Sequence, residues 1–240
     1  MIKRWFPGKR LGNRKTFQQP ELDTLSSMQE KQGKFITFEG PDGSGKTAQL
    51  DILAEEFLQA GYPILKTREP GGTPIGNQIR ATLLDLKNTA MVDRTEALLY
   101  QAARSQLVEE IIKPHLMEGG IVMCDRYADS TLAYQGYGHR NTVESLQGII
   151  HYATGGLTPD LTLLLDLEPE VGLQRRLDAG GLNRLDAYDI DFHHRVRAGY
   201  LELVKADPGR WVIVDAEKPF NEVQSDLRGI LLKWLKSWGF

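Results

Sequence analysis

A glycine-rich segment that ends in a lysine and a threonine carries the clearest chemical pattern in the chain. Residues 40–47 fit G-x-x-x-x-G-K-[ST], with an apolar run before them and a helical pattern after them. Glycines there let backbone amides curl around a phosphate, and a helix N-terminus favours its negative charge. We expect the whole loop to bind a nucleoside triphosphate: Gly40, Pro41, Asp42, Gly43, Ser44, Gly45, Lys46 and Thr47.

Four side chains near this loop have the types that phosphoryl transfer needs. Lys46 would place a cation between the β- and γ-phosphates, and the Thr47 hydroxyl is a hard oxygen ligand for Mg²⁺. Asp125 ends the apolar run 121–124 and can orient the same metal, directly or through water. Arg126 follows at the carboxyl edge of the expected sheet, where open α/β sheets bind ligands. We expect Arg126 to hold a second phosphate against the γ-phosphate.

Further motifs resemble the thymidylate kinase family, in the family's order and spacing, over about residues 34–238. They are FEGPDGSGKT at 38–47, TREPGGT at 67–73, AAR at 102–104, DRY at 125–127, AYQG at 133–136, PDLTLLLD at 159–166 and LNRL at 182–185. The resemblance implies transfer of a phosphoryl group from ATP to dTMP with Mg²⁺, giving dTDP and ADP for dTTP supply. It also implies a homodimer, formed through long helices such as 94–117.

The same resemblance implies the contacts to dTMP. Arg104 corresponds to the arginine that reads the thymine edge. Tyr100, one helical turn earlier and on the same face, corresponds to the aromatic that stacks on the base, where the family usually has Phe. The other expected contacts are Thr131 and Gln135 to the base, Tyr134 under the sugar, Asp42 to the 3′-hydroxyl, and Arg68 and Arg126 to the acceptor phosphate. A tight turn at Glu69–Pro70 favours a cis peptide bond there.

Residues 175–186 are expected to form a mobile lid that closes over ATP and excludes water. An arginine in such a lid can neutralise charge in the transition state. The phosphate-binding loop here has Ser44 and no arginine, which resembles the bacterial-type branch in which the lid supplies that charge. Arg176 and Arg184 are both candidate catalytic residues, and the sequence does not choose between them.

The loop motif alone leaves other functions open, because GTPase switches, ATPases and kinases share it. Residues 178–181 match D-x-x-G and residues 183–186 loosely match N-K-x-D, but neither directly follows an apolar strand, so a switch is disfavoured. A kinase for another nucleoside monophosphate or a nucleoside remains an alternative. A catalytically weak P-loop binding protein is another, since Asp178 and Ala179 occupy a lid stretch that is commonly basic.

The elements that must position these residues alternate along the chain. We expect strands at 35–38, 63–67, 121–124, 161–165 and 211–214, and helices at 46–60, 94–117, 186–205 and 221–237, with Pro114 bending the second helix. Continuous apolar strands between helices indicate a parallel sheet covered on both faces. The sequence predicts one α/β domain over 34–240, a five-stranded parallel sheet flanked by helices of the P-loop nucleotide kinase type.

Charge and composition set limits on partners and location. Residues 1–20 carry six basic and no acidic side chains, and residues 1–33 are interpreted as a disordered basic and polar extension, with a targeting segment or a partner-binding arm as alternatives. The net charge of −3 therefore leaves an acidic body, which argues against nucleic acid as a partner. No apolar stretch is long enough for a membrane span, and the single Cys124 favours a reducing, cytoplasmic location.

Two groups of residues are not expected to carry chemistry. His193 and His194 are adjacent, so on a helix they point about 100° apart and cannot ligate one metal together. Trp234 and Trp238 share a stripe with Leu227 and Leu231, which is typical of a helix that packs on a core.

Overall fold

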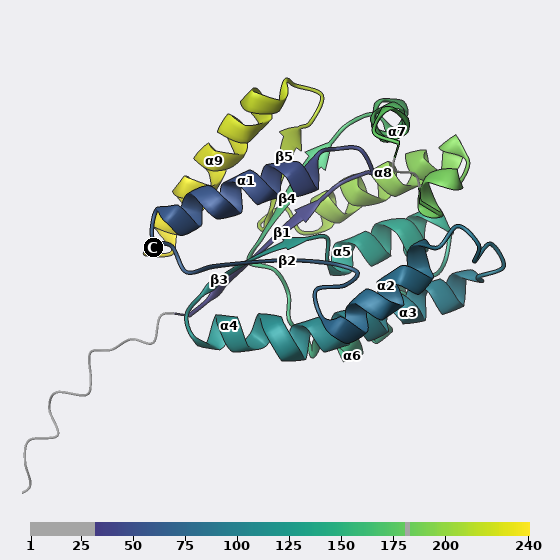
Figure 1. The fold of residues 1–240 in the computed structure, drawn as a ribbon, viewed down its shortest axis with the longest axis horizontal. Coiled ribbons are helices and arrows are strands. Elements are labelled where there is room, and N and C mark those ends of the chain that lie inside the picture. The colour runs from purple at the N-terminus through teal and green to yellow at the C-terminus, as the bar shows by residue number, and fades with distance from the viewer. Residues whose placement is uncertain (1–31, 181–182) are drawn as a thin grey trace, which may run out of the picture. The chain divides into compact units, whose positions relative to one another are not determined.

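The structure is a computed structural model that describes residues 32–180 and 183–240. Its sheet has five parallel strands in the order β2-β3-β1-β4-β5 (Figure 1). The strands are β1 (Lys34–Glu39), β2 (Ile64–Arg68), β3 (Ile121–Asp125), β4 (Leu161–Asp166) and β5 (Trp211–Asp215). Every predicted strand is present to within one residue at either end, and the predicted fold class is confirmed.

Helices connect consecutive strands, as parallel pairing requires. They are α1 (Lys46–Gln59), α2 (Pro74–Leu84), α3 (Asp93–Leu107), α4 (Lys113–Met117), α5 (Ala128–Thr131), α6 (Val143–Thr154), α7 (Pro169–Asp178), α8 (Ile190–Ala206) and α9 (Phe220–Ser237). Two π-helical segments, η1 (Val108–Ile112) and η2 (Leu132–Gly138), and a 3₁₀ turn, η3 (Leu185–Ala187), complete the described elements. The helices α2, α5, α6 and α7 have no counterpart in the sequence-based assignment.

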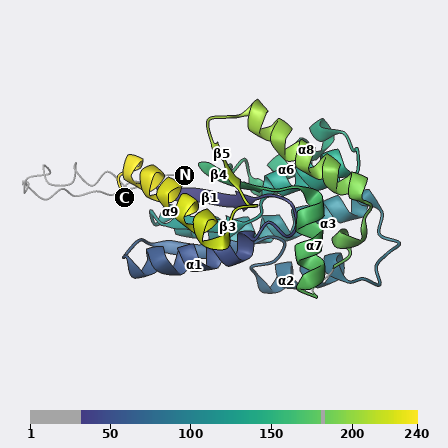
Figure 2. The ribbon, with the colours of Figure 1, turned by 90° about the horizontal axis from the view of Figure 1, so that it is seen from above.

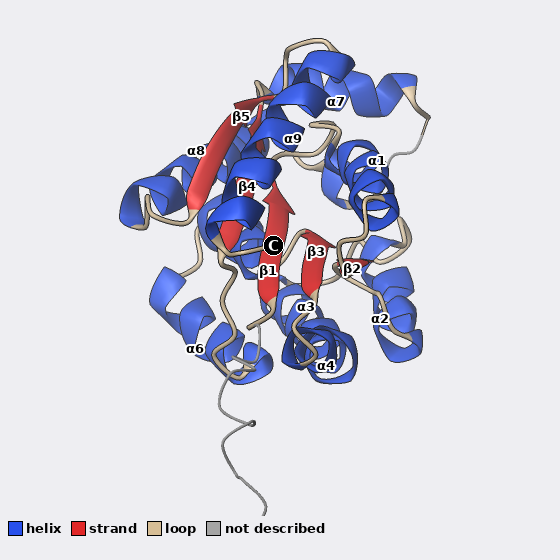
Figure 3. Cartoon of the chain, turned by 90° about the vertical axis from the view of Figure 1, so that its left-hand side faces the viewer, coloured by secondary structure: helices blue, strands red, loops and turns tan. Residues whose placement is uncertain are grey.

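Alternating side chains of the strands pack against helices on both faces of the sheet. Ile36 and Phe38 of β1 belong to one core cluster with α1 and α9, whereas Phe35 packs on the other face with Leu107 of α3 and its continuation η1. Helix α8 and η2 cover that second face over β4. Figures 1 and 2 both show α1 and α9 side by side, and Figure 3 shows the red strands among the blue helices.

The predicted helix 94–117 runs as α3, η1 and α4 without a break. Pro114 has no N–H to donate to the preceding turn, and the π-helical segment η1 lies just before it. The predicted start of the helix at 186 is wrong: η3 precedes it and α8 begins at Ile190. Asp189 is the N-cap, because its Oδ1 accepts the Phe192 N–H at 2.7 Å.

Several smaller expectations can be compared with the packing. Cys124 is fully buried, and burial raises the pKa of its thiol well above the ordinary value, as for a structural residue. On α9, Leu227 and Leu231 are buried and Trp234 and Trp238 pack against the same core, so the stripe is confirmed. None of the described helices is long and apolar enough to cross a membrane. The predicted extension 1–33 lies outside the described residues except for its last two.

The register of the sheet brings the candidate site residues to its carboxyl edge. Asp125, the last residue of β3, pairs with Phe38 of β1 on one side and with Arg68 of β2 on the other. The loop that follows β1 and the segment that follows β3 therefore leave the sheet next to each other. The order of strands places β1 between β3 and β4, so chain crossovers diverge on its two sides, and such a point is where open α/β sheets bind ligands.

Candidate active site

The phosphate-binding loop between β1 and α1 has the backbone shape that its motif requires. Gly43 and Gly45 have φ values of 77° and 82°, in a left-handed region that glycine enters without strain. A Cβ at Gly43 would lie 2.1 Å from the carbonyl oxygen of Gly172 on α7. Only glycine therefore fits where this loop meets α7, and the loop ends at Gly45, the N-cap of α1, where a helix N-terminus is a favourable place for a phosphate.

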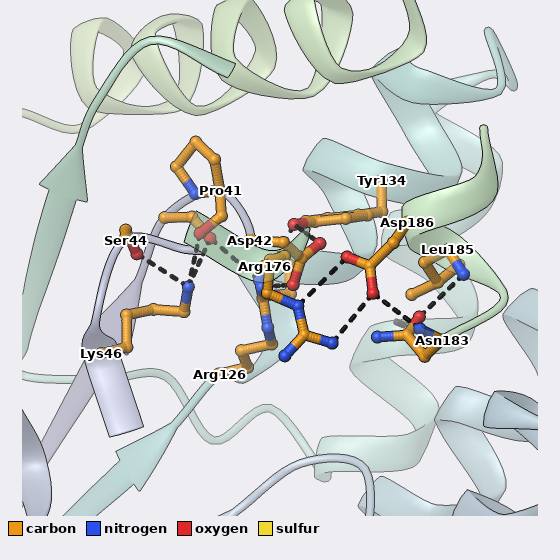
Figure 4. A network of polar contacts seen from close by, with 12 residues as sticks. Pro41, Asp42, Ser44, Lys46, Arg126, Tyr134, Arg176, Asn183, Leu185 and Asp186 are labelled. Carbon is orange, nitrogen blue, oxygen red and sulfur yellow. Dashed lines mark hydrogen bonds and ion pairs between the residues drawn. The ribbon is translucent and has the colours of Figure 1, made fainter. Parts of the chain in front are cut away.

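Lys46 is held inside the loop. Its Nζ donates to the carbonyl oxygens of Gly40 and Pro41 at 2.9 and 2.8 Å, and to Oγ of Ser44 at 2.9 Å (Figure 4). Burial, together with the positive charge of Arg126, lowers the pKa of Lys46 to about 7. A bound phosphate would supply the opposite charge, so nucleotide binding and protonation of Lys46 favour each other.

The two predicted metal ligands lie next to each other. Oγ1 of Thr47, in the first turn of α1, donates to Oδ2 of Asp125, at the end of β3, over 2.5 Å. Hydroxyl and carboxylate oxygens are ligand types that Mg²⁺ accepts. The structure brings this pair together beside the phosphate-binding loop, and its role in metal binding stays a prediction.

Arg126 is fixed in an uncommon backbone conformation, with a φ of 67°. Its guanidinium donates to the Gly40 carbonyl at 3.0 Å, to Asp42 Oδ1 at 2.8 Å and to the Tyr134 hydroxyl at 3.1 Å (Figure 4). Two further acceptors, Ser130 Oγ and Tyr200 OH, lie at 3.2 Å each. The arginine is therefore held rigidly between the phosphate-binding loop and the second face of the sheet.

Asp42 joins the loop to that second face. Its carboxylate accepts from Arg126 at 2.8 Å and from the Tyr134 hydroxyl at 2.7 Å. Burial opposes ionisation of Asp42, but the positive charges of Arg126 and Lys46 outweigh it and lower the pKa to about 2. Asp42 is consequently an ionised hydrogen-bond acceptor at neutral pH.

Two adjoining cavities open at the carboxyl edge of the sheet. The larger one, of about 480 Å³, is lined by Lys46, Thr47, Asp125, Arg126 and Arg68, with Arg176 on its lid side. A smaller apolar one is lined by Tyr100, Arg126, Ser130, Thr131, Tyr134, Gln135 and Leu185. The smaller cavity has a volume of about 20 Å³, and the two cavities adjoin because Tyr100, Arg126 and Leu185 line both.

Arg104 lies behind the smaller cavity and contacts Thr131, one of the residues that line it. It is 1% exposed and pairs with Glu69, and its Nη1 donates to Thr131 Oγ1 at 3.1 Å and to Gln101 Oε1 at 2.8 Å. Nη2 also donates to the Tyr127 carbonyl at 2.9 Å. The predicted base readers Tyr100, Thr131 and Gln135 do line this cavity, whereas direct reading of a base by Arg104 stays a prediction.

The two candidate lid arginines have different surroundings. Arg176, at the end of α7, lines the larger cavity and pairs with Asp186 at 2.9 Å (Figure 4). Arg184 is 7% exposed and bonds Glu96, the Tyr188 hydroxyl and the Leu83 carbonyl. Residues 181 and 182 of the predicted lid lie outside the described part.

Several residues at the site were missed by reasoning from the sequence. Arg80 of α2 lines the larger cavity and donates to the Pro70 carbonyl at 2.9 Å. Glu39 is fully buried and accepts from Tyr127 N–H, Ser130 Oγ and Tyr200 OH, the last two of which also contact Arg126. Glu39 lies within the motif 38–47 at the end of β1 but had no role assigned to it, and Arg80 lies on a helix that the sequence analysis did not assign. The predicted cis bond at Glu69–Pro70 is confirmed.

A parallel sheet with a phosphate-binding loop after β1 and a buried arginine after β3, both lining one cavity, defines a P-loop nucleotide kinase. Residues 38–227 match the family model described as thymidylate kinase. The chain belongs to the thymidylate kinase family.

Individual relatives agree over most of the chain. A thymidylate kinase of Roseiflexus castenholzii is 47% identical over 216 residues, which are 85% of this chain and 94% of the relative. A thymidylate kinase of Herpetosiphon aurantiacus is 51% identical over 207 residues, 76% of this chain and 88% of the relative. The crystal structure of thymidylate kinase from Ehrlichia chaffeensis has a TM-score of 0.69 at 33% identity, covering 83% of this chain and 98% of that one.

Proposed function

We propose that the chain transfers the γ-phosphoryl group of ATP to the phosphate of dTMP, which gives ADP and dTDP for dTTP synthesis. Membership of the thymidylate kinase family supports this substrate pair. The observation that carries the proposal is that Lys46 and Arg126, from the segments that follow two adjacent strands, line one cavity. Two anionic substrates that meet end to end need cations of this kind at the point of contact.

The donor lies on the phosphate-binding loop. Lys46 would turn from the carbonyls of Gly40 and Pro41 to the β- and γ-phosphates, since a phosphate is a stronger partner for an ammonium than a carbonyl. The nucleoside would occupy another opening, of about 520 Å³, which shares Arg175 with the 480 Å³ cavity beside Lys46 and extends to the loop after β5. Arg175 donates to the Ala216 carbonyl at 2.9 Å on this side.

The acceptor phosphate lies between Arg126, Arg68 and Arg80. An oxygen of the dTMP phosphate attacks the γ-phosphorus, and the bond to the β-phosphate oxygen of ADP breaks. The fixed position of Arg126 supports this role, because a cation that is already oriented needs no rearrangement in the transition state. Arg176 is the lid arginine that we assign to the γ-phosphate, since it lines the cavity and Arg184 is bound elsewhere.

The sugar would lie where the two cavities meet, and the base would enter the smaller cavity, which must widen from about 20 Å³ to hold it. Asp42 accepts a hydrogen bond from the 3′-hydroxyl. Tyr134 packs under the sugar, and its hydroxyl holds it in place by donating to Asp42. Tyr100 stacks on thymine, and Thr131 and Gln135 contact its polar edge. Arg104 holds Thr131 in place from behind.

The pair Thr47 and Asp125 fits Mg²⁺, because it offers a hydroxyl and a carboxylate oxygen at the mouth of the phosphate-binding loop. When bound with ATP, the metal would neutralise part of the charge on the transferred group. We assign Thr47 as a direct ligand and Asp125 as a direct or water-mediated one.

A coupled assay of ADP release tests the function. Purified protein with Mg²⁺ and ATP is supplied with dTMP, dUMP, dCMP, AMP or thymidine in parallel. We expect dTMP to have the highest kcat/KM. Equal turnover of AMP, or turnover of thymidine alone, would replace the proposed acceptor by another one.

We also propose that the protein acts as a homodimer in the cytoplasm. Leu98 of α3 and Tyr152 of α6 are 51% and 89% exposed on two helices that pack together, which supports an interface there. The only cysteine is buried, so a disulfide-free location suits the chain. Light scattering coupled to gel filtration should give twice the chain mass, 27.0 kDa per copy.

A further inference from the structure

A buried carboxylate lies directly behind the smaller cavity. Glu96 of α3 is 1% exposed and accepts hydrogen bonds from Gln135 Nε2 at 2.7 Å, from His139 Nε2 at 3.2 Å and from Arg184 Nη2. Burial opposes its ionisation, but the bonds from His139 and Arg184 outweigh this and lower its pKa. An ionised carboxylate can only accept, so each of its neighbours must present an N–H to it.

This requirement fixes which way the Gln135 amide points. Its NH₂ group must face Glu96, because the opposite orientation would set the amide oxygen against a carboxylate oxygen. The carbonyl oxygen Oε1 is then the atom that Gln135 can offer to the cavity it lines. Among the described residues, none donates a hydrogen bond to that oxygen.

The hydroxyl of Thr131 is oriented in the opposite sense. Its Oγ1 accepts from Arg104 Nη1 at 3.1 Å and from Gln101 Nε2 at 3.3 Å, which uses both lone pairs. The single O–H hydrogen must therefore point away from these two side chains, and Thr131 lines the same cavity as Gln135. The cavity thus presents one acceptor, Gln135 Oε1, and one donor, the Thr131 hydroxyl, and the buried partners of these side chains fix both roles.

We propose that Glu96 is a positioning residue that determines base specificity: by locking the Gln135 amide it makes the cavity accept a hydrogen bond from N3–H of thymine while Thr131 donates to O4. Cytosine offers the reverse pattern, an acceptor at N3 and an amino donor at C4, and would meet like groups at both positions. Uracil has the thymine pattern. This inference rests on the proposed function, since it assumes that the smaller cavity holds the base.

Glu96→Gln is the decisive variant, because it keeps the shape and adds a donor. Its amide oxygen would stay with Arg184, whose charge makes it the stronger donor, and its NH₂ would face Gln135. Gln135 must then turn over and present NH₂ to the base. His139 can adapt, because its other nitrogen faces Asp93 Oδ1 at 3.4 Å and can carry the proton.

We expect the ratio of kcat/KM for dTMP to that for dCMP to fall by at least about 10-fold in Glu96→Gln, the cost of one mismatched buried hydrogen bond. The ratio for dTMP to dUMP should not change, because both bases carry N3–H and O4. Asp93→Asn is the matched control on the same helix: it contacts His139 and not Gln135, so both ratios should stay at the wild-type value. An unchanged dTMP/dCMP ratio in folded Glu96→Gln overturns the proposal.

A second variant keeps the idea testable if Glu96→Gln does not fold. Gln135→Met removes the locked acceptor, so it should lower kcat/KM for dTMP and dUMP by about 10-fold and leave the value for dCMP unchanged or higher. An equal loss for all three acceptors would show that Gln135 only fills space. The wild-type assay distinguishes failure of the proposed function from failure of this inference. Absence of dTMP turnover by wild type refutes the proposed function. Wild-type preference for dTMP that both variants retain refutes only the role of Glu96.

Discussion

Raising the pH should weaken nucleotide binding through Lys46 in particular. In the ligand-free site, burial and Arg126 hold the pKa of Lys46 at about 7, below its usual 10.5, against the attraction of Asp42 and Asp125. Phosphates placed against Nζ favour the ammonium, so ADP binds mainly to the protonated form. At pH 8.5 the free lysine is mostly neutral, and binding should take up about one proton.

The size of the effect follows from the protonated fraction. With a pKa of about 7 in the free protein, the protonated fraction of free Lys46 falls from about one half at pH 7 to about 1% at pH 9, whereas phosphates keep the bound lysine protonated over this range. The affinity for ADP should therefore fall roughly 50-fold over this range. Calorimetric titration with metal-free ADP, in buffers of different ionisation enthalpy, measures both the affinity and the protons taken up.

Lys46→Arg provides the control, because a guanidinium does not titrate in this range. It should bind ADP with no pH dependence between 7 and 9 and no proton uptake at pH 8.5. If wild type takes up no proton at pH 8.5, Lys46 is already charged in the free site. If Lys46→Arg takes up as many protons as wild type, another group such as Glu39 titrates instead.

Four more changes have expected outcomes. Arg176→Ala should lower kcat at least about 10³-fold, measured in single-turnover assays, with little change in dTMP affinity. Arg184→Ala should instead lower the free energy of unfolding in denaturant by about 3 to 5 kcal/mol, because Glu96 loses its buried partner. Burial and the charge of Asp129 raise the pKa of Glu39 to about 7, so its protonated form stabilises the fold fully below pH 4.5 and this stabilisation is lost as the pH rises to 7. The difference in unfolding free energy between wild type and Glu39→Gln should therefore shrink by about 3 kcal/mol over that pH range. Removal of residues 1–31 should leave kcat and Tm nearly unchanged, because residues 32–240 fall within one compact unit, and a drop of several degrees would contradict this.

Residues inside motifs could be placed from the sequence because their role depends on the local backbone. The glycines before Lys46 and the strand before Arg126 fix where each leaves the sheet, and the structure has both at the predicted edge. Glu39 and Glu96 escaped notice since their importance comes from partners far along the chain, such as Tyr200 and Arg184. A single acid in a helix has the same local pattern whether it faces water or a buried amide.

The predicted helix boundaries were wrong where a helix cap or a short turn determines them. The apolar period that begins near residue 192 does not show that the helix starts after Asp189, whose side chain caps it by accepting the Phe192 N–H. Thr131 and the motif at 133–136 were predicted only to contact the base, although they belong to α5 and the π-helical η2. An extra residue per turn changes which side chains share a face, so the ordinary helical period cannot describe it.

The strand order has a consequence for the nascent chain. The first two strands to leave the ribosome, β1 and β2, do not pair with each other, because both pair with β3, and β1 also needs β4. The loop that cradles phosphate is therefore complete in sequence early in translation yet has no neighbouring strands until residues 121–166 have been made. During that interval its apolar strand is exposed, which makes this stage the one at which a chaperone would have most to protect.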